Sequence, residues 1–118
     1  MKRVKLTNTN EGEVIKQCID ILNQGGLVVY PTETCYGIAV DASNSKALSK
    51  LLSYKTFRGS KPISIAVCDI DMAKRYVQLN EIAFNIYKNY LPGPITVVSK
   101  SKGILQPPVV SKQGTKGI

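Results

Sequence analysis

The sequence predicts an α/β fold, in which strands and helices alternate along the chain. Short apolar runs of high strand propensity, such as LVVY at residues 27–30, recur between segments whose apolar residues are spaced three or four apart. Prolines, glycines and polar residues separate these segments. With 118 residues the chain can bury one modest core but not two, so we expect a single domain over residues 1–118.

The first elements are a weak strand and a helix. Residues 4–6 alternate weakly, which predicts a short edge strand. Asn10 opens the helix, and Glu13, three positions on, has the spacing of a capping box. Gly25 and Gly26 end it, because glycine tolerates the left-handed conformation at a helix C-terminus.

Two strands and a second helix follow. The run at residues 27–30 predicts a buried strand that leads into the polar sequence PTETCYG, and residues 36–40 predict the next strand. Ser43 or Asn44 then caps a helix that ends in the basic sequence YKTFRGSKP. Its buried side is expected to carry apolar residues at helical spacing: Ala47, Leu48, Leu51 and Leu52.

The second half repeats the alternation. PISIAV at residues 62–67 predicts a third strand, and an Asp-capped short helix is expected near residues 70–77. Asn80 caps a further helix, and LPGPITVVS predicts a rigid turn followed by a fourth strand. From Lys100 onward we expect a loop and no closing element, since the tail lacks periodicity. The apolar stripe of the last helix is expected to be Ile82, Ile86 and Tyr90.

Composition excludes several classes of protein. No apolar run approaches the roughly 18 residues that a membrane helix needs, and the N-terminus lacks a signal-peptide pattern. We therefore expect a soluble, cytoplasmic protein with no membrane contact. The three cysteines fit neither a disulfide framework nor a CxxC metal site. Because histidine is absent, any chemistry must depend on Lys, Arg, Thr, Ser or carboxylates.

The net charge of +8 is unevenly distributed. Residues 42–68 and residues 82–118 each contain basic residues and no acidic residue. A solvated basic surface is one interpretation. The other is a site for phosphate or nucleic acid, because basic clusters concentrate polyanions.

Three polar segments at the ends of expected strands are candidates for a site: PTET at 31–34, KTFRGSK at 55–61 and PGPIT at 92–96. Taken singly, each has a structural explanation as a turn cap, a group of solvated charges or a rigid turn. In this order and spacing, YPTETCYGI, KTFRGSKPISI and LPGPITVV resemble the YrdC family of threonylcarbamoyl-adenylate synthases. The resemblance covers nearly all of residues 14–99.

The resemblance implies a twisted mixed sheet with flanking helices, and a reaction of L-threonine, bicarbonate and ATP with Mg²⁺. The product, threonylcarbamoyl-AMP, serves the modification of adenosine in tRNA. Thr32 and Thr34 match the threonines that bind or order the threonine substrate. Lys55 and Arg58 are the implied catalytic residues, and the implied ATP-binding residues are Arg58, Lys61 and Thr96.

The match loosens in the basic segment. Phe57 stands where the family has arginine, and Arg58 stands where proline usually follows. Either Arg58 takes over the role of that arginine, which a long guanidinium side chain permits, or the site is altered. Cys35 occupies a position that is usually valine, so we expect a small buried apolar side chain there. Glu33 either ligates magnesium or faces solvent, and we predict no metal site made of protein ligands alone.

The resemblance also implies that a later arginine-containing strand and a Ser-x-Asn motif lie outside these 118 residues. We therefore expect this chain by itself to self-associate, to bind phosphate weakly and to lack synthase activity. One alternative is a YrdC-like module that binds double-stranded RNA or tRNA without adenylation. A further alternative is the related carbamoyl-transfer domain of hydrogenase maturation proteins.

Overall fold

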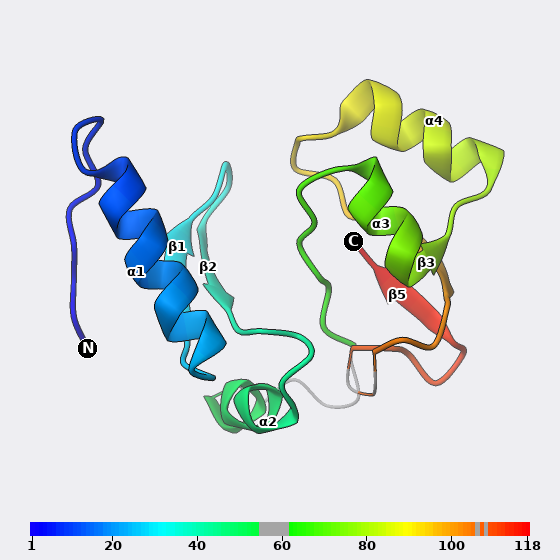
Figure 1. The fold of residues 1–118 in the computed structure, drawn as a ribbon. Helices are drawn as coiled ribbons and strands as arrows, with labels where there is room; N and C mark the ends of the chain where they lie inside the picture. Colours follow the sequence, from blue (N-terminus) through cyan, green and yellow to red (C-terminus); the bar gives the residue numbers. More distant parts are fainter. Residues whose placement is uncertain (55–61, 106, 108) are drawn as a thin grey trace. The chain divides into compact units, whose positions relative to one another are not determined.

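The computed structural model describes residues 1–54, 62–105, 107 and 109–118. The chain divides into two compact units, Met1–Tyr54 and Lys55–Ile118, which Figure 1 shows in blue to green and in green to red. Helices and strands alternate in both, so the predicted α/β class is confirmed. No helix of the described residues is long and apolar enough to cross a membrane.

The first unit contains an antiparallel hairpin between two helices. Its elements are α1 (Glu11–Asn23), β1 (Val28–Pro31), β2 (Tyr36–Ala39) and α2 (Ser45–Tyr54). The expected glycine stop is confirmed, because Gly25, which follows the C-cap residue Gln24 of α1, has a φ of 73°. Its carbonyl oxygen accepts a hydrogen bond of 3.3 Å from the Lys50 ammonium, which ties the end of α1 to α2.

The two helices of this unit begin differently. Asn44 caps α2, since its side-chain oxygen accepts from the backbone N–H groups of Lys46 and Ala47, both at 3.1 Å. Asn10 precedes α1, but its side chain turns away and accepts from the N–H of Thr7 at 2.8 Å. The expected capping box is therefore wrong, because a tight turn before the helix uses the asparagine instead. Residues 4–6, expected as an edge strand, form no strand.

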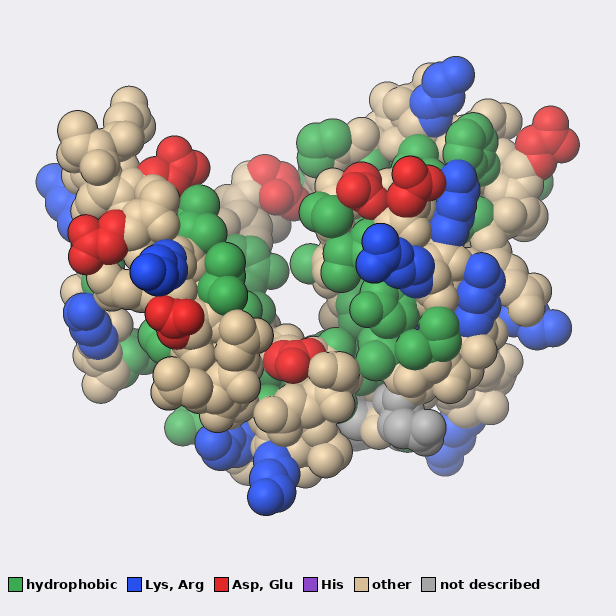
Figure 2. All heavy atoms as spheres, viewed as in Figure 1, with side chains coloured by type: hydrophobic (Ala, Val, Ile, Leu, Met, Phe, Trp, Pro, Cys, Tyr) green, Lys and Arg blue, Asp and Glu red, His purple; other side chains and the backbone are tan. Residues whose placement is uncertain are grey.

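The expectation of a buried strand at residues 27–30 is also wrong. Val29 is 50% exposed and Tyr30 is 36% exposed, and α1 has no fully buried residue. Side chains of a strand alternate between two faces, and one helix can cover at most one face of a two-stranded sheet. The green side chains at the surface in Figure 2 include such incompletely covered apolar groups.

The second unit is built around a three-stranded antiparallel sheet of order β3-β4-β5. Its elements are α3 (Ile70–Tyr76), β3 (Val77–Gln78), α4 (Glu81–Tyr90), β4 (Val98–Ser101) and β5 (Thr115–Gly117). The tail from Lys100 was expected to contain no closing element, and this is wrong. A turn at Gly114, which has a φ of 76°, returns the chain as β5 against β4.

The expected strand at residues 62–67 is an extended segment without a full ladder. Its side chains alternate between exposed and half-buried, as the pattern predicts. The N–H of Ile65 in this segment donates to the carbonyl of Gly117 at 3.0 Å. On the opposite edge of β5, the backbones of Ile118 and Val97 exchange hydrogen bonds of 2.7 and 3.0 Å. The end of β5 thus lies between two segments.

The core of this unit lies under α3 and α4. It consists of Ala73, Val77, Ala83, Tyr87, Val97 and Ile118. The expected stripe on α4 is confirmed at Ile86, which packs against the core, and is wrong at its two ends, because Ile82 is 71% exposed and Tyr90 is 63% exposed. Ala83 and Tyr87 face the core instead, an alternative that the sequence pattern also permits at i and i+4 spacing.

One charged side chain is buried with this core. Lys116 on β5 is 1% exposed, and its ammonium has no hydrogen-bond partner among the described residues. It lies 5.5 Å from the centre of the Tyr76 ring. Burial lowers the pKa of Lys116, because the charged form loses its hydration.

Asn80 should contribute to stability through its cap on α4. Its side-chain oxygen accepts from the N–H of Ala83 at 2.8 Å, so Asn80→Ala should lower the free energy of unfolding by about 1 kcal/mol. Urea unfolding measures this difference. Asn10→Ala is the matched control, because the Asn10 side chain makes no capping hydrogen bond to α1. An equal loss of unfolding free energy in the two variants would contradict the capping role of Asn80.

Candidate functional site

The PTET segment forms the turn of the β1–β2 hairpin. The last strand pair is Pro31 with Tyr36, and the N–H of Thr32 donates to the carbonyl of Cys35 at 3.0 Å. Neither Glu33 nor Thr34 has a positive φ, so the turn is not one of the primed types that two-residue hairpins favour. Something other than backbone preference must therefore stabilise it.

The hydroxyl of Thr32 supplies that stabilisation. Its oxygen accepts from the N–H of Cys35 at 3.1 Å and from the N–H of Thr34 at 3.3 Å, and it donates to the carbonyl of Cys35. Threonine and serine hydroxyls commonly hold turns in this way. Thr32 thus organises the turn and has no hydrogen left to donate to a ligand.

Thr34 differs from Thr32 in its bonding. Its hydroxyl lies 3.5 Å from the Thr32 hydroxyl and 3.9 Å from the sulfur of Cys35, and both contacts are long. The side chain is exposed. Of the two threonines, Thr34 therefore presents the hydroxyl that can bind a substrate.

The strands below this turn pack closely at one position. Gly37 pairs with Tyr30, and a Cβ on Gly37 would lie 3.0 Å from the Tyr30 ring. The tyrosine ring thus lies close to the backbone of the facing strand, and a larger residue at position 37 would require the ring to shift by a few tenths of an ångström.

The PGPIT segment brings Thr96 to the second unit's sheet. Thr96 is exposed and lies next to Gly117, where an added Cβ would be 2.9 Å from the Thr96 methyl group. The same Cβ would be 2.8 Å from the hydroxyl oxygen of Ser64. Sequence reasoning missed Ser64 and Gly117, although the alternation in PISIAV already placed Ser64 on the polar side of its segment.

The expected site residues divide among these parts of the chain. Thr32 and Thr34 lie together in the first unit, and Thr96 lies in the second. Lys55, Arg58 and Lys61 fall outside the described residues, so their roles stay predictions.

The cysteines offer no activated nucleophile. Cys35 is exposed, which contradicts the expected buried apolar side chain, because the hairpin turn has no covering element among the described residues. Cys68 is exposed too, and its thiol donates to a carboxylate oxygen of Asp69 at 3.4 Å. This hydrogen bond and the negative charge raise the pKa of Cys68 and disfavour the thiolate.

The described residues offer no ready-made cage for a metal ion. They contain no group of three or more Asp, Glu, Cys or His side chains that could hold one, and Glu33 is exposed. Mg²⁺ in nucleotide sites usually keeps several waters and is held by one or two carboxylates and the substrate phosphates. The residues present fit a magnesium ion held largely by the nucleotide.

Comparisons with known proteins agree in sequence and fold. A family model for Sua5, YciO and YrdC proteins, described as telomere recombination, matches residues 20–118. A relative from Methanocaldococcus jannaschii is 36% identical over 94% of this chain and 55% of its own length. The threonylcarbamoyl-AMP synthase of Aliivibrio fischeri is 34% identical over 70% of this chain and 46% of its own length.

Two solved structures share the fold. Escherichia coli YciO superposes with a TM-score of 0.82 at 22% identity, over 91% of this chain and 52% of its own. P. abyssi Sua5, solved in complex with L-threonine, gives a TM-score of 0.83 at 21% identity, over 98% of this chain and 33% of its own. The chain spans about half the length of the curated relatives it matches.

Proposed function

This chain belongs to the Sua5/YciO/YrdC family, and from that premise we propose that it serves the synthesis of threonylcarbamoyl-AMP from L-threonine, bicarbonate and ATP. The observation that carries the proposal is the PTET turn, which presents the hydroxyl of Thr34 while that of Thr32 holds the turn. Such an arrangement suits recognition of a small amino acid that itself carries a hydroxyl group.

The proposed reaction places two anions together. The amine of threonine attacks the carbon of bicarbonate to give a carbamate with loss of water, and one oxygen of the carbamate attacks the α-phosphorus of ATP. The bond from that phosphorus to the bridging oxygen breaks, and pyrophosphate leaves. Because carbamate and triphosphate are both negative, the site must neutralise charge and fix geometry.

Basic side chains suit this task. We assign Lys55, Arg58 and Lys61 to the charge of the phosphates, with Lys55 and Arg58 closest to the reacting groups, and Thr96 to a hydrogen bond with ATP. A magnesium ion bound with ATP would neutralise part of the phosphate charge. None of these roles requires a histidine, which this chain lacks.

Replacing Thr34 tests threonine recognition. Thr34→Val keeps the side-chain volume and removes the hydroxyl, so L-threonine should bind about tenfold more weakly, as expected for one lost hydrogen bond. The affinity for MgATP should stay within twofold. Isothermal titration with each substrate measures both.

Thr32→Val is the matched comparison. It removes the hydroxyl that holds the turn, so it should shift the amide resonances of Thr34 and Cys35 even without substrate, whereas Thr34→Val should leave the turn intact. If Thr34→Val weakens the binding of both substrates equally, or of neither, Thr34 is only a turn residue.

The synthase reaction is tested by pyrophosphate release. We would measure it in a chimera that continues after Ile118 with the remaining part of the Aliivibrio fischeri synthase. Release should require L-threonine, bicarbonate and MgATP together. Release that does not depend on threonine, or none with all three substrates, contradicts the proposed activity.

A second function, binding of tRNA or double-stranded RNA, is favoured by the charge of +8. In the face that Figure 2 shows, Lys and Arg side chains are present at the surface of each of the two units. RNA binding without threonine-dependent pyrophosphate release would favour this second function. For a tRNA-modifying role we also propose a cytoplasmic location.

A further inference from the structure

Lys116 is a buried amine that the proposed reaction does not use. Its side chain is 1% exposed, and its Nζ has no hydrogen-bond partner among the described residues. The Tyr76 ring, centred 5.5 Å from Nζ, offers an aromatic face in place of an acceptor oxygen. An apolar side chain would fill the same volume without the cost of burying an amine. Packing alone therefore does not explain why a lysine stands here.

A serine hydroxyl lies next to Lys116 in the ladder. Ser99 on β4 pairs directly with Lys116 on β5, and both side chains are buried on the same face of the sheet. Directly paired residues of antiparallel strands have Cβ atoms about 4.5–5.5 Å apart. The Ser99 hydroxyl forms no hydrogen bond within the described part of the chain, so it can donate to a group attached to Lys116.

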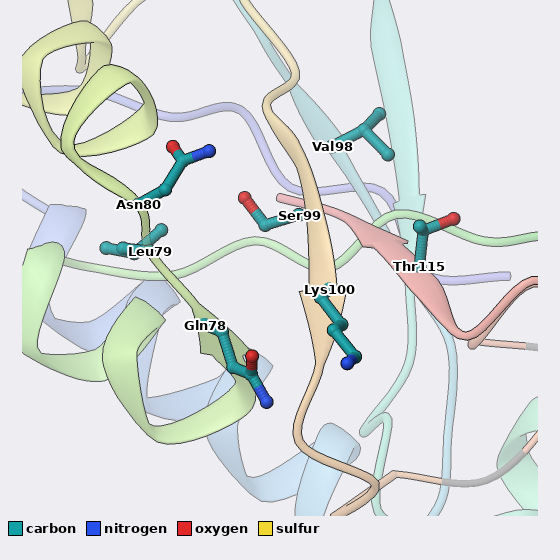
Figure 3. Close-up of a pocket in the computed structure, with 7 residues that line it drawn as sticks. All are labelled: Gln78, Leu79, Asn80, Val98, Ser99, Lys100 and Thr115. Carbon is teal, nitrogen blue, oxygen red and sulfur yellow. The ribbon is translucent and has the colours of Figure 1, made fainter.

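A groove of about 440 Å³ reaches Ser99. Ser99 lines it together with Leu79 and Asn80, and Figure 3 shows the Ser99 side chain pointing toward Asn80 and away from Val98. A small molecule at Ser99 is one strand spacing, about 5 Å, from the strand that carries Lys116. Large or charged reagents cannot follow it, because the Lys116 side chain is enclosed.

We infer that Lys116 is a site of carbamylation by carbon dioxide, with the Ser99 hydroxyl donating a hydrogen bond to the carbamate that forms. The lone pair of the neutral amine attacks the carbon of CO2, one C–O π pair moves onto oxygen, and the nitrogen loses one proton to water. The product is an N-carboxylated lysine with one negative charge. Its oxygens accept hydrogen bonds, which an ammonium group cannot do.

The surroundings of Lys116 favour this reaction. Burial lowers the pKa of Lys116, so a larger fraction of its amine is neutral at a given pH than for an exposed lysine. Carbon dioxide is small and uncharged, so it enters an apolar interior without losing the hydration of a charge. Local opening of β5, a strand of three residues whose lysine and glycine do not favour strands, can also admit it.

This inference goes beyond the proposed function. In the proposed synthase reaction the carbon of bicarbonate becomes attached to threonine, whereas here carbon dioxide becomes attached to the chain itself. The modification would make the stability of the second unit depend on dissolved carbon dioxide, because only the folded chain offers the enclosed amine beside Ser99.

The test uses the 118-residue chain incubated with isotopically labelled bicarbonate, which supplies carbon dioxide. Carbon NMR should show a carbamate resonance. Alkylation of the carbamate with a trialkyloxonium reagent, followed by mass analysis of the peptides, should place the adduct on Lys116. The α-amino group of Met1 should also give an adduct, since chain-terminal amines are partly neutral near neutral pH, and it serves as an internal reference.

The variants separate Lys116 from other amines and hydroxyls. Lys116→Met should lose the adduct of the strand peptide and keep that of Met1. Ser99→Ala should weaken carbamate formation at Lys116 about fivefold, as expected for one lost hydrogen bond. The controls Lys112→Met, which removes an exposed lysine, and Ser49→Ala, which removes a hydroxyl that bonds within α2, should both match the unaltered chain.

Urea unfolding gives a second measurement. Dissolved carbon dioxide should raise the urea midpoint of the unaltered chain, because Lys116 is protonated and unreactive in the unfolded chain. It should not raise the midpoint of Lys116→Met at equal ionic strength.

An adduct on Met1 with none on Lys116 would overturn the inference. Labelling of the exposed Lys112 to the same extent as Lys116 would overturn it too, because burial beside Ser99 would then confer no reactivity.

Discussion

Replacing Lys55 or Arg58 by alanine in the chimera is expected to reduce pyrophosphate release by about 30- to 1000-fold, equivalent to about 2–4 kcal/mol of transition-state stabilisation. Each side chain would contribute a charge-assisted contact to phosphate oxygens, whose charge is redistributed as the α-phosphorus is attacked. Because the contact strengthens in the transition state, kcat should fall more than the KM for ATP rises.

Arg58 is the sharper of the two tests, since Phe57 stands where the family has arginine. Arg58→Lys should recover only part of the activity, because lysine lacks the planar guanidinium that binds two oxygens at once. Lys61→Ala should reduce pyrophosphate release less than Lys55→Ala or Arg58→Ala does. Lys112→Ala should cause no measurable reduction. Unchanged release in Arg58→Ala would show that the displaced arginine has not taken over the family role.

The second large effect concerns the buried lysine. Lys116→Met should raise the free energy of unfolding at pH 7 by about 1–4 kcal/mol, because methionine fills a similar volume without a buried charge that lacks a hydrogen-bonded partner. Its cation–π contact with Tyr76, 5.5 Å away, recovers part of the lost hydration but cannot replace a hydrogen bond.

The same substitution should change the dependence of stability on pH. The pKa of Lys116 in the folded chain lies below its ordinary value of 10.5, so the unfolded chain binds more protons between these two values. The contribution of Lys116 to the free energy of unfolding should therefore rise with pH through that window, and below it the full cost of the buried charge is present.

Urea unfolding across that pH range measures the slope. Lys116→Met should remove the rising contribution of Lys116 and so make the slope less positive, and the exposed control Lys112→Met should leave the slope of the unaltered chain unchanged. A loss of stability in Lys116→Met at pH 7 would show that the ammonium is better solvated than its burial indicates.

The sequence predicts local structure best where a short-range signal decides it. Asp69 and Asn80 cap α3 and α4 as expected, because each side chain bonds an N–H three residues on. Asn10 has the same signature and fails, since the preceding turn competes for its side chain. Which of the two local bonds forms depends on the path of residues 1–9, which carry no strong pattern.

The failures at longer range have one physical cause. The closing strand β5 has the sequence TKG, and neither its lysine nor its glycine favours a strand. It forms because β4 and Ile65 supply hydrogen-bond partners from distant parts of the chain. For the same reason the PTET threonines could be identified from sequence, but not the contact between Ser64 and Gly117, which lie far apart in the chain.

The position of β5 between β4 and residues 62–67 affects how the chain is made. Ile65 leaves the ribosome about fifty residues before its hydrogen-bond partner Gly117, a delay of roughly 3–10 s at usual rates of translation. During that time the extended segment has alternating apolar side chains and no strand to pair with. The strands of the hairpin in the first unit are near neighbours in the sequence, so that hairpin has no such delay. We therefore expect chaperones to bind nascent chains stalled before residue 115 chiefly at residues 62–67.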